Sequence, residues 1–391
     1  MMRPSLIMVS EPGSFAERTI VHRKPQIIAN VIAHNDYAPA IVDALNRLAC
    51  EIANGIVQPL RDEAEDGAFW QDAWSRWRGC TWRQLGWFFA ETYFYRRLLE
   101  TVHYFRPGPW YGADPFAHEK REALVQGLVA LTDYAPWPDD WPPQKRIAAW
   151  LLRSLWGNRA DLSNMTIQRD LQTPTQASSE HLLVDDSRAV AERLARGQVG
   201  RVDWIADNSG LEIAVDLGMI DMLLSEHLVR EVRVHVKPQP YFVSDAMIKD
   251  VEHTLDALAA HSDAKLSAMG QRLQVARDEG RMRLETHPFW ATCLGFDAFP
   301  RDLAETLGQA DLLVFKGDVN YRRLLDDRHW PPTTPMKACA SYMPAPFCVL
   351  RTLKGELIVG LREGQAEALA ERDADWLING QRGVIHLVVP R

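Results

Sequence analysis

The sequence lacks the cysteine pattern of a disulfide-stabilised protein or a thiolate zinc protein. Its five cysteines, Cys50, Cys80, Cys293, Cys339 and Cys348, are odd in number and widely spaced, and no two of them form a CxxC pair. Disulfide frameworks and thiolate zinc sites need paired, regularly spaced cysteines. We therefore expect free thiols in a reducing compartment, which indicates a cytoplasmic protein.

Long apolar runs and an excess of positive charge are also missing. No uninterrupted apolar run reaches transmembrane length, and the apolar run at residues 6–9 is too short for the core of a signal peptide. The 44 Lys and Arg residues are outnumbered by 52 Asp and Glu, which gives a net charge of −8. Such a chain has no overall basic field, so we expect neither a nucleic acid nor a membrane partner.

The motifs of several common enzyme classes are absent as well. There is no GxGxxG after a strand, no GxxxxGKS/T, no HExxH and no GxSxG. Dinucleotide-binding, P-loop, zincin and α/β-hydrolase functions therefore lack support. The twelve histidines are dispersed, and we interpret His34 and His287 as surface or capping residues rather than metal ligands.

What the first half does contain is helical periodicity and tryptophan. Ten of the fourteen tryptophans precede residue 160. Apolar residues at helical spacing predict helices at 26–33, 39–53, 69–77, 81–102, 115–131 and 143–156. The helix at 81–102 begins with a capping box, Thr81 with Gln84. The polar residues 164–186 indicate a surface loop or linker.

The second half alternates short apolar runs with helical stretches. The predicted strands are 202–206, 231–236, 281–285, 311–316, 347–352 and 383–389. The predicted helices are 187–197, 211–226, 245–260, 299–309 and 363–372. This alternation is typical of an α/β fold with a mostly parallel sheet and helices on both faces.

Polar residues follow the first buried strand of this half, at Asp207-Asn208-Ser209-Gly210. A strand that ends there and turns into a helix presents these groups at the carboxyl edge of the sheet, where ligands of open α/β sheets bind. Carboxylate and carboxamide oxygens suit Mg²⁺ or Mn²⁺. The alternative is an Asn/Gly turn in which Asp207 caps the helix.

Other predicted strand ends carry complementary groups. Asp245 and Asp318 add oxygen ligands, and Lys316, Arg322 and Lys354 are cations suited to a phosphate. Taken singly, each has an ordinary explanation as a helix cap, a surface residue or a solvated turn. Together they indicate a divalent metal with an anionic substrate at one sheet edge.

At this point the chain resembles a known family. The stretches 207–210 (Asp-Asn-Ser-Gly), 242–245 (Phe-Val-Ser-Asp), 315–322 (Phe-Lys-Gly-Asp-Val-Asn-Tyr-Arg) and 351–354 (Arg-Thr-Leu-Lys) resemble motifs of the damage-control phosphatases. The Arg-Thr-x-Lys signature is similar to that of subfamily III, the sugar-phosphate phosphatases also named acidic-residue methyltransferase-like proteins. Residues 13–16, 19–20, 23, 91–97, 156–158 and 161–163 are similar to the family too, so the resemblance extends from about residue 13 to the C-terminus.

The resemblance implies a fold and a domain division. A flexible N-terminus at 1–12 would precede an all-helical domain at 13–175 and a Rossmann-like α/β/α sandwich at 176–391, the catalytic domain. We expect the helices before about residue 175 to cover the carboxyl edge of the sheet.

The resemblance also implies a function. It implies hydrolysis of phosphomonoesters such as fructose 1-phosphate and fructose 6-phosphate with one divalent metal, Mn²⁺ first and otherwise Co²⁺, Ni²⁺ or Mg²⁺. Carried over by position, the metal ligands are Asp207, Asn208 and Asp245. Substrate contacts fall to Asp207, Asn208, Asp318, Val319, Asn320, Tyr321, Arg322 and Lys354, with Lys354 on the phosphate.

Five further residues are weaker candidates. Glu212 matches a position linked to S-adenosylmethionine, and Asn158 and Asp161 match a subfamily motif that could contact sugar hydroxyls. Lys316 and Arg351 are additional cations near the predicted site.

In this interpretation, Arg322 and Lys354 neutralise charge on the phosphoryl oxygens, and Asp207 or Asp318 acts as base or nucleophile. Two rivals remain open. One is a carboxyl (glutamate) methyltransferase using S-adenosylmethionine, although the 207–210 turn has one Gly where such a cofactor needs a Gly-rich loop. The other is a sugar-phosphate-binding protein without catalysis.

Overall fold

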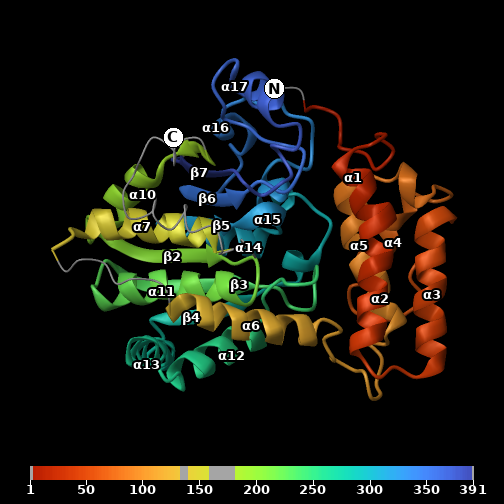
Figure 1. The fold of residues 1–391 in the computed structure, drawn as a ribbon, viewed down its shortest axis with the longest axis horizontal. Coiled ribbons are helices and arrows are strands. Elements are labelled where there is room, and N and C mark those ends of the chain that lie inside the picture. Colours follow the sequence, from red (N-terminus) through yellow and green to blue (C-terminus); the bar gives the residue numbers. More distant parts are fainter. Residues whose placement is uncertain (1–2, 133–139, 158–180, 390–391) are drawn as a thin grey trace.

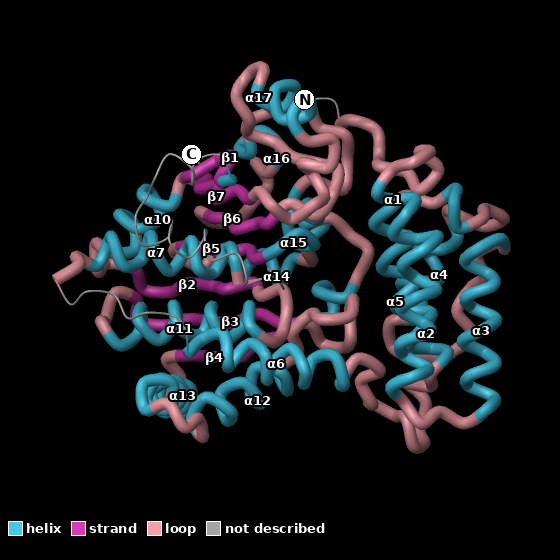
Figure 2. The backbone as a smooth tube through the Cα atoms, in the orientation of Figure 1, coloured by secondary structure: helices cyan, strands magenta, loops and turns pink. Residues whose placement is uncertain are grey.

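A central sheet and a layer of helices beside it make up the chain in the computed structural model, which describes residues 3–132, 140–157 and 181–389 (Figure 1). The sheet has seven strands in the order β1-β7-β6-β5-β2-β3-β4. The strands are β1 Leu182–Asp185, β2 Val199–Ile205, β3 Val229–Val236, β4 Met282–Thr286, β5 Leu312–Lys316, β6 Phe347–Thr352 and β7 Gly383–Val388. Figure 2 shows them as one stack through the centre of the larger part.

The sheet confirms the expected mostly parallel α/β architecture. All strand pairs are parallel except β6 with β7, which is antiparallel. The chain runs outward from β2 through β3 to β4, then returns to the other side of β2 for β5 and β6. The direction of winding therefore reverses between β2 and β5, and a crevice for ligands lies at the carboxyl ends of such a pair.

One strand falls where the sequence indicated a loop. β1 lies inside the stretch 164–186 and pairs in parallel with β7, Leu182 opposite Gly383. It is a short edge strand whose residues are only partly buried. Its pairing partner lies about 200 residues away, so local composition gave no signal for it.

Alternating residues of each central strand enter two different cores. Trp204 and Val314 face one core, whereas Ile205 and Phe315 face the other. Strands that are buried on both sides read as nearly continuous apolar runs, which is why the sequence located them so well.

Helices cover both faces of the sheet. One face carries α7 (Pro143–Trp156), α10 (Ser187–Leu194), α11 (Leu211–Ser225), α12 (Ile248–Ala259) and α13 (Ala264–Asp278). The other carries α14 (Arg301–Leu307), α15 (Gly317–Leu324) and α16 (Met336–Cys339). The helix α17 (Gln365–Arg372) lies at the outer end of the molecule (Figure 1). The sequence did not predict α13, α15 or α16.

The helical layer consists of α1 (Phe15–Arg18), the π-helical turn η1 (Thr19–Arg23), α2 (Lys24–His34), α3 (Pro39–Asn54), α4 (Gly67–Ser75) and α5 (Trp87–Thr101). Its aromatic side chains pack on one another, for example Phe89 stacked on Tyr93 with ring centroids 5.1 Å apart. These aromatic side chains therefore form the core of the layer. The layer faces the carboxyl ends of the strands, as expected for a cap (Figure 1).

The expected helix at 81–102 is two elements. The capping box at Thr81 and Gln84 is present, but it starts a single 3₁₀ turn, Trp82–Gln84. Leu85 is then extended and accepts a hydrogen bond from the Val9 amide at 3.0 Å. Pairing with the N-terminal segment thus interrupts the helix, and α5 begins only at Trp87.

Residues 3–12, expected to be flexible, are docked. Ile7 and Val9 are fully buried. The Ile7 amide donates to the Asp327 carbonyl at 3.0 Å, and the Ile7 carbonyl accepts from the Trp87 amide at 2.9 Å. The segment therefore forms a seam between the helical layer and the loop after α15.

The helices before residue 175 divide between two places. The first five form the layer, but α6 (Ala117–Thr132) packs on α11, and α7 packs on α10, α11 and β6 (Figure 1). The domain boundary near 175 stays a prediction, and these two helices lie with the sheet. Among the described residues no helix has the length and apolarity needed to cross a membrane.

Candidate functional site at the carboxyl edge of the sheet

Two loops at the carboxyl edge of the sheet pair with each other and bring three predicted ligands together. The Ala246 amide donates to the Asp207 carbonyl at 2.8 Å, and the Ser209 amide donates to the Ser244 carbonyl at 2.7 Å. Asn208 and Asp245 face each other in an antiparallel bridge. The loops after β2 and β3 therefore act as one short ladder that fixes Asp207, Asn208 and Asp245 side by side.

The carboxylates of this group are buried without sufficient hydrogen bonds. Among the described residues, Asp207 Oδ1 has no hydrogen-bond partner and Asp245 Oδ2 has the ion pair with Lys237; the two residues are 4% and 1% exposed. Burial, with the charges of Glu212 and Asp245, raises the pKa of Asp207 well above its usual value. Burial raises the pKa of Asp245 to about 6, although Lys237 Nζ lies 3.2 Å from its carboxylate. Two buried carboxylates that share one cation between them favour a further bound cation.

Asn208 connects this group to the start of α11. Its amide nitrogen donates to Asp207 Oδ2 and to Glu212 Oε2, each at 2.8 Å, and its oxygen accepts from the Ser244 hydroxyl. The oxygen keeps a second lone pair, which could serve a metal. With Asp207 and Asp245 this gives an all-oxygen donor set, which fits a hard divalent cation.

Lys316, expected near a phosphate, is occupied within the protein. Its ammonium donates to Glu212 Oε1 at 2.9 Å, to Asp216 Oδ1 at 3.1 Å and to the Ser154 carbonyl at 2.9 Å. Burial disfavours its charge, but the two carboxylates outweigh burial and raise the pKa of Lys316. All three protons are used, so Lys316 positions Glu212 rather than an anionic ligand. Glu212 is in turn held by Lys316 and Asn208.

Gly317 permits the close approach of β5 to the Asp207 loop. It has φ +82°, and a Cβ built on it would lie 1.8 Å from Asp207 Oδ2. No other residue type fits this position without moving the carboxylate. Gly317 begins α15, which presents Asp318 one residue later.

The helical geometry of α15 divides the predicted substrate segment. Asp318, Val319 and Arg322 line a cavity at the sheet edge. Asn320 and Tyr321 turn away from it. The Asn320 amide donates to the Lys316 carbonyl at 2.7 Å, and the Tyr321 hydroxyl accepts from the Val359 amide at 3.0 Å. Residues 318, 319 and 322 share one face of a 3.6-residue helix, so the structure does not bring the other two to the site.

Arg351 is buried and holds both Asp318 and the turn that carries Lys354 through hydrogen bonds. Its guanidinium donates to Asp318 Oδ1 at 2.7 Å and to the Gly355 carbonyl at 3.0 Å. The Lys354 amide also points to Asp318 Oδ1, at 3.4 Å. Arg351 therefore sets the distance between Asp318 and Lys354, and both of these residues line the cavity.

Arg322 is held by two carboxylates from opposite sides. It donates to both oxygens of Asp327, at 2.7 and 3.0 Å, and to Glu91 of α5. Its guanidinium also lies over the Trp87 ring, 3.4 Å from the centroid. The predicted phosphate ligand is thus also an ion-pair bridge between α15 and the helical layer.

Lys24 is a site residue that sequence reasoning missed. It is 1% exposed, donates to Glu91 Oε1 at 2.6 Å and lies over the Tyr95 ring, 4.8 Å from its centroid. Burial lowers the pKa of Lys24 to about 8 despite Glu91. Burial would raise the pKa of Glu91, but Lys24 and Arg322 together lower it to about 2. Glu91 faces two cations, which outweigh burial and favour its charge, whereas Lys24 has one carboxylate, which does not outweigh burial.

These groups surround a cavity of about 140 Å³ between the helical layer and the sheet edge. Phe15, Thr19, Arg23, Lys24, Trp87, Glu91 and Tyr95 line it from the helical side. Phe242, at the sheet side, has φ +55° and packs against Tyr95 with centroids 4.8 Å apart. A positive φ in a bulky residue is costly and is concentrated at functional sites. The sequence signal for this wall was the family resemblance at 13–16, 19–20, 23 and 91–97.

A larger groove of about 980 Å³ lies within the helical layer, between α3 and α5. Two of its acids are paired: Arg97 lies 3.1 Å from Glu51 and 3.4 Å from Glu100. The smaller cavity is the better candidate because buried carboxylates and cations from several segments line it, and Asp207 Oδ1 there has no hydrogen-bond partner among the described residues. Asn158 and Asp161 fall outside the described residues, so their predicted contacts stay predictions.

Comparison with known proteins gives a family and full-length relatives. A family model described as the damage-control phosphatase ARMT1-like domain matches residues 19–369. The chain is 32% identical over 441 aligned residues to damage-control phosphatase ARMT1 of Danio rerio, with 100% of this chain and 98% of that protein covered. It is 30% identical to the proteins of that name from Rattus norvegicus and Mus musculus, with 99% of each chain covered.

A solved structure of a DUF89 family protein from Pyrococcus horikoshii is also similar. The two chains share 14% identity and a TM-score of 0.46, over 86% of this chain and 92% of that one.

Proposed function

The chain belongs to the ARMT1-like damage-control phosphatases, and we propose that it hydrolyses sugar phosphomonoesters such as fructose 1-phosphate and fructose 6-phosphate with a divalent metal. The observation that carries the proposal is the buried carboxylate pair at the switch between β2 and β5, in which Asp207 Oδ1 has no hydrogen-bond partner among the described residues and Asp245 Oδ2 has the Lys237 ammonium at 3.2 Å. A cavity with room for a small anionic molecule adjoins them. Buried acids next to buried cations suit a metal and a phosphate together better than either alone.

Asp207, Asn208 and Asp245 would hold the metal, with Mn²⁺ as the first choice for an all-oxygen set. When bound, a hard divalent cation polarises a phosphoryl oxygen and compensates its charge. Glu212 and Lys316 orient Asn208 from behind, as the outer partners of metal ligands commonly do.

The remaining residues act on the substrate. Lys354 and Arg322 border the cavity and favour the charge that spreads over the phosphoryl oxygens during transfer. Asp318, which Arg351 holds, would accept a proton from the attacking group. On the helical side, the buried Lys24 and Glu91 form part of the cavity wall, and the low-dielectric surroundings there strengthen each of these interactions.

The test is a phosphatase screen of the metal-stripped protein. Phosphate release from a panel of sugar monophosphates, including both fructose phosphates, is measured with added Mn²⁺ and with chelator. We expect turnover with Mn²⁺ and a loss of more than a hundredfold with chelator.

Asp207→Asn is the matched variant, since it keeps the shape and removes one charge. It should lose metal and turnover while it unfolds no earlier than the metal-free wild type, because a buried unpaired charge is removed. Substrate binding without turnover in every metal tested would instead favour the binding-protein alternative.

A further inference from the structure

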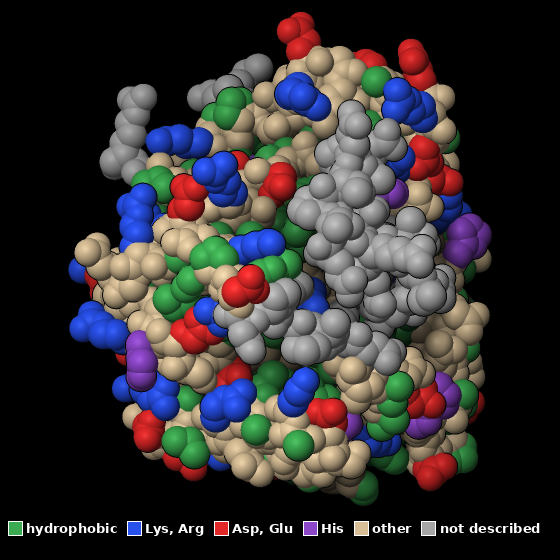
Figure 3. All heavy atoms as spheres, turned by 60° about the vertical axis from the view of Figure 1, so that its left-hand side comes forward, with side chains coloured by type: hydrophobic (Ala, Val, Ile, Leu, Met, Phe, Trp, Pro, Cys, Tyr) green, Lys and Arg blue, Asp and Glu red, His purple; other side chains and the backbone are tan. Residues whose placement is uncertain are grey.

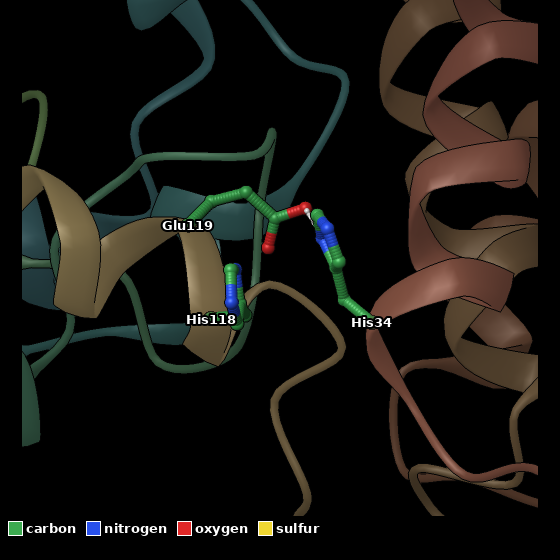
Figure 4. A group of neighbouring side chains, drawn as sticks. All are labelled: His34, His118 and Glu119. Atoms are coloured by element: carbon green, nitrogen blue, oxygen red, sulfur yellow. Dashed lines mark hydrogen bonds and ion pairs between the residues drawn. The ribbon is translucent and has the colours of Figure 1, made fainter.

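Two histidines and a glutamate meet where the helical layer approaches α6. His34 is the last residue of α2, and His118 and Glu119 lie in the first turn of α6 (Figure 4). One ligand atom from each lies within 4.8 Å of the other two. Figure 4 shows the Glu119 carboxylate and the two imidazoles turned toward one another from the two helices. The group joins segments more than 80 residues apart.

The three side chains make few hydrogen bonds, so some of their nitrogen and oxygen atoms could bind an ion. His34 Nδ1 lies 3.2 Å from Glu119 Oε1, and the two imidazole rings stack with centroids 4.2 Å apart. Among the described residues, His118 Nδ1 and Glu119 Oε2 are buried and have no hydrogen-bond partner. Glu122, one turn further along α6, brings a carboxylate oxygen to 3.7 Å from His118 Nδ1. Two imidazoles and the Glu119 carboxylate therefore lie close enough to share one ion, and the Glu122 carboxylate lies beside His118.

The backbone on both sides is already fixed. The Asn35 amide donates to the Pro115 carbonyl at 3.0 Å and to the Val31 carbonyl at 2.9 Å, which ties the end of α2 to the start of α6. Lys120, in the same turn of α6, pairs with Asp114 and with Asp250 of α12. The histidine side chains are 36% and 39% exposed, so their rings have room to rotate toward an ion.

We propose that His34, His118 and Glu119 bind a second divalent cation of the zinc type, with Glu122 or water completing the shell. Imidazole nitrogens with carboxylate oxygens suit Zn²⁺, Co²⁺ or Ni²⁺, whereas the Asp207 group, which has oxygen donors only, suits Mn²⁺ or Mg²⁺. The two sites thus differ in the metal that they select. This inference does not depend on the proposed phosphatase activity.

The role of this ion is to join two parts of the molecule. α2 starts at Lys24, in the wall of the cavity, and ends at His34. α6 packs on α11, which starts just after the Asp207-Asn208 turn. An ion held between α2 and α6 stabilises the position of the helical layer over the sheet edge. Binding to the folded state alone raises thermal stability.

Zinc content tests the proposal. Chelator-stripped wild type, His34→Ala and His118→Ala are dialysed against the same free Zn²⁺ concentration, and bound zinc is measured per chain. The control is His253→Ala, an exposed histidine of α12. We expect each site variant to bind one zinc fewer than wild type, and the control to match wild type.

Further measurements separate this site from the Asp207 group. Asp207→Asn should keep the zinc that His34→Ala loses. Co²⁺ added to Asp207→Asn should give the visible absorption of nitrogen-coordinated cobalt. The double variant with Asp207→Asn and His34→Ala should not show this absorption. Zn²⁺ should raise the melting temperature of wild type more than that of Glu119→Gln, which keeps the side-chain shape. Equal zinc content in wild type, His34→Ala and His118→Ala would overturn the proposal and leave a hydrogen-bonded surface cluster.

Discussion

Lys354 lines the cavity, and its proposed role is to bind the substrate phosphate. It follows the buried strand β6, and its own backbone is held by Asp318, which Arg351 fixes. We expect Lys354→Ala to lower kcat/KM on fructose 1-phosphate by at least about a hundredfold, the scale for removing one charge-stabilising donor. The melting temperature should stay near that of wild type.

The control for this variant is Lys337→Ala, whose ammonium donates to the Val389 carbonyl on the exposed surface just past the end of β7. It should change neither quantity. A large fall in melting temperature with normal specific activity in Lys354→Ala would make Lys354 a structural residue.

Glu91 is the residue on which the buried charges of the cavity wall converge. It pairs with Lys24 and Arg322, and removing one partner of a buried pair typically costs about 3–5 kcal/mol. Glu91→Gln should therefore unfold far more easily than wild type at pH 7. Glu305→Gln, which breaks an exposed pair on α14, should unfold like wild type.

The stability that Glu91→Gln loses relative to wild type depends on pH. The pKa of Glu91 is about 2 in the folded chain and 4.5 by its usual value. A depressed carboxyl pKa contributes stability that is fully present above pH 4.5 and is lost as pH falls toward 2. The difference in unfolding free energy between wild type and Glu91→Gln should thus be constant from about pH 5 to 7 and shrink below about pH 4. A difference that grows on acidification would contradict this assignment.

At the scale of elements, the contact between β5 and the loop after β2 depends on one glycine. Gly317→Ala would place a Cβ at 1.8 Å from Asp207 Oδ2, on a residue with φ +82°. We expect a loss of at least about 2 kcal/mol in stability, from the left-handed backbone and the displaced carboxylate, together with loss of metal binding. Unfolding and metal titration measure the two effects.

Gly364→Ala separates backbone strain from the clash. Gly364 has φ +76°, and nothing lies within 4 Å of the position that an added Cβ would occupy. Gly364→Ala should lose about 1 kcal/mol of unfolding free energy and retain the metal. If Gly317→Ala behaves like Gly364→Ala, the close approach is not needed for the site.

At the scale of the whole molecule, the N-terminal segment joins the two parts. Ile7 is fully buried and its backbone pairs with both Trp87 and Asp327. Ile7→Ala should lower the free energy of unfolding by about 2–5 kcal/mol, the range for truncating an aliphatic side chain in a packed core. Denaturant unfolding with tryptophan fluorescence would measure it. Val275→Ala, at a half-exposed position on α13, is the control and should cost much less.

Surface charge is distributed without one dominant sign over the described part of the face in Figure 3, where Lys and Arg side chains alternate with Asp and Glu. This distribution agrees with the modest net charge of −8. The concentrated charges of the molecule are instead buried, around Asp207, Lys316 and Glu91.

The sequence by itself determined the central sheet and the positions of its polar turns. Six strands were predicted within a few residues, because strands such as β5, buried on both faces, are short apolar runs whatever surrounds them. The order of the loops then placed Asp207 and Asp245 at one edge, since parallel strands share their carboxyl ends. Family membership, expected from the motifs at 207–210 and 351–354, is confirmed by the family model.

Only the tertiary structure decided which charges are committed to partners within the chain. Arg322 and Lys316 read alike in sequence as phosphate ligands, yet each is bound by acids between 100 and 231 residues away or within its own loop. Lys24 gave no local signal because its burial comes from packing against α5 and Phe242. Local periodicity reports whether a residue is buried, whereas the pairing of a buried charge depends on which distant segments fold against it.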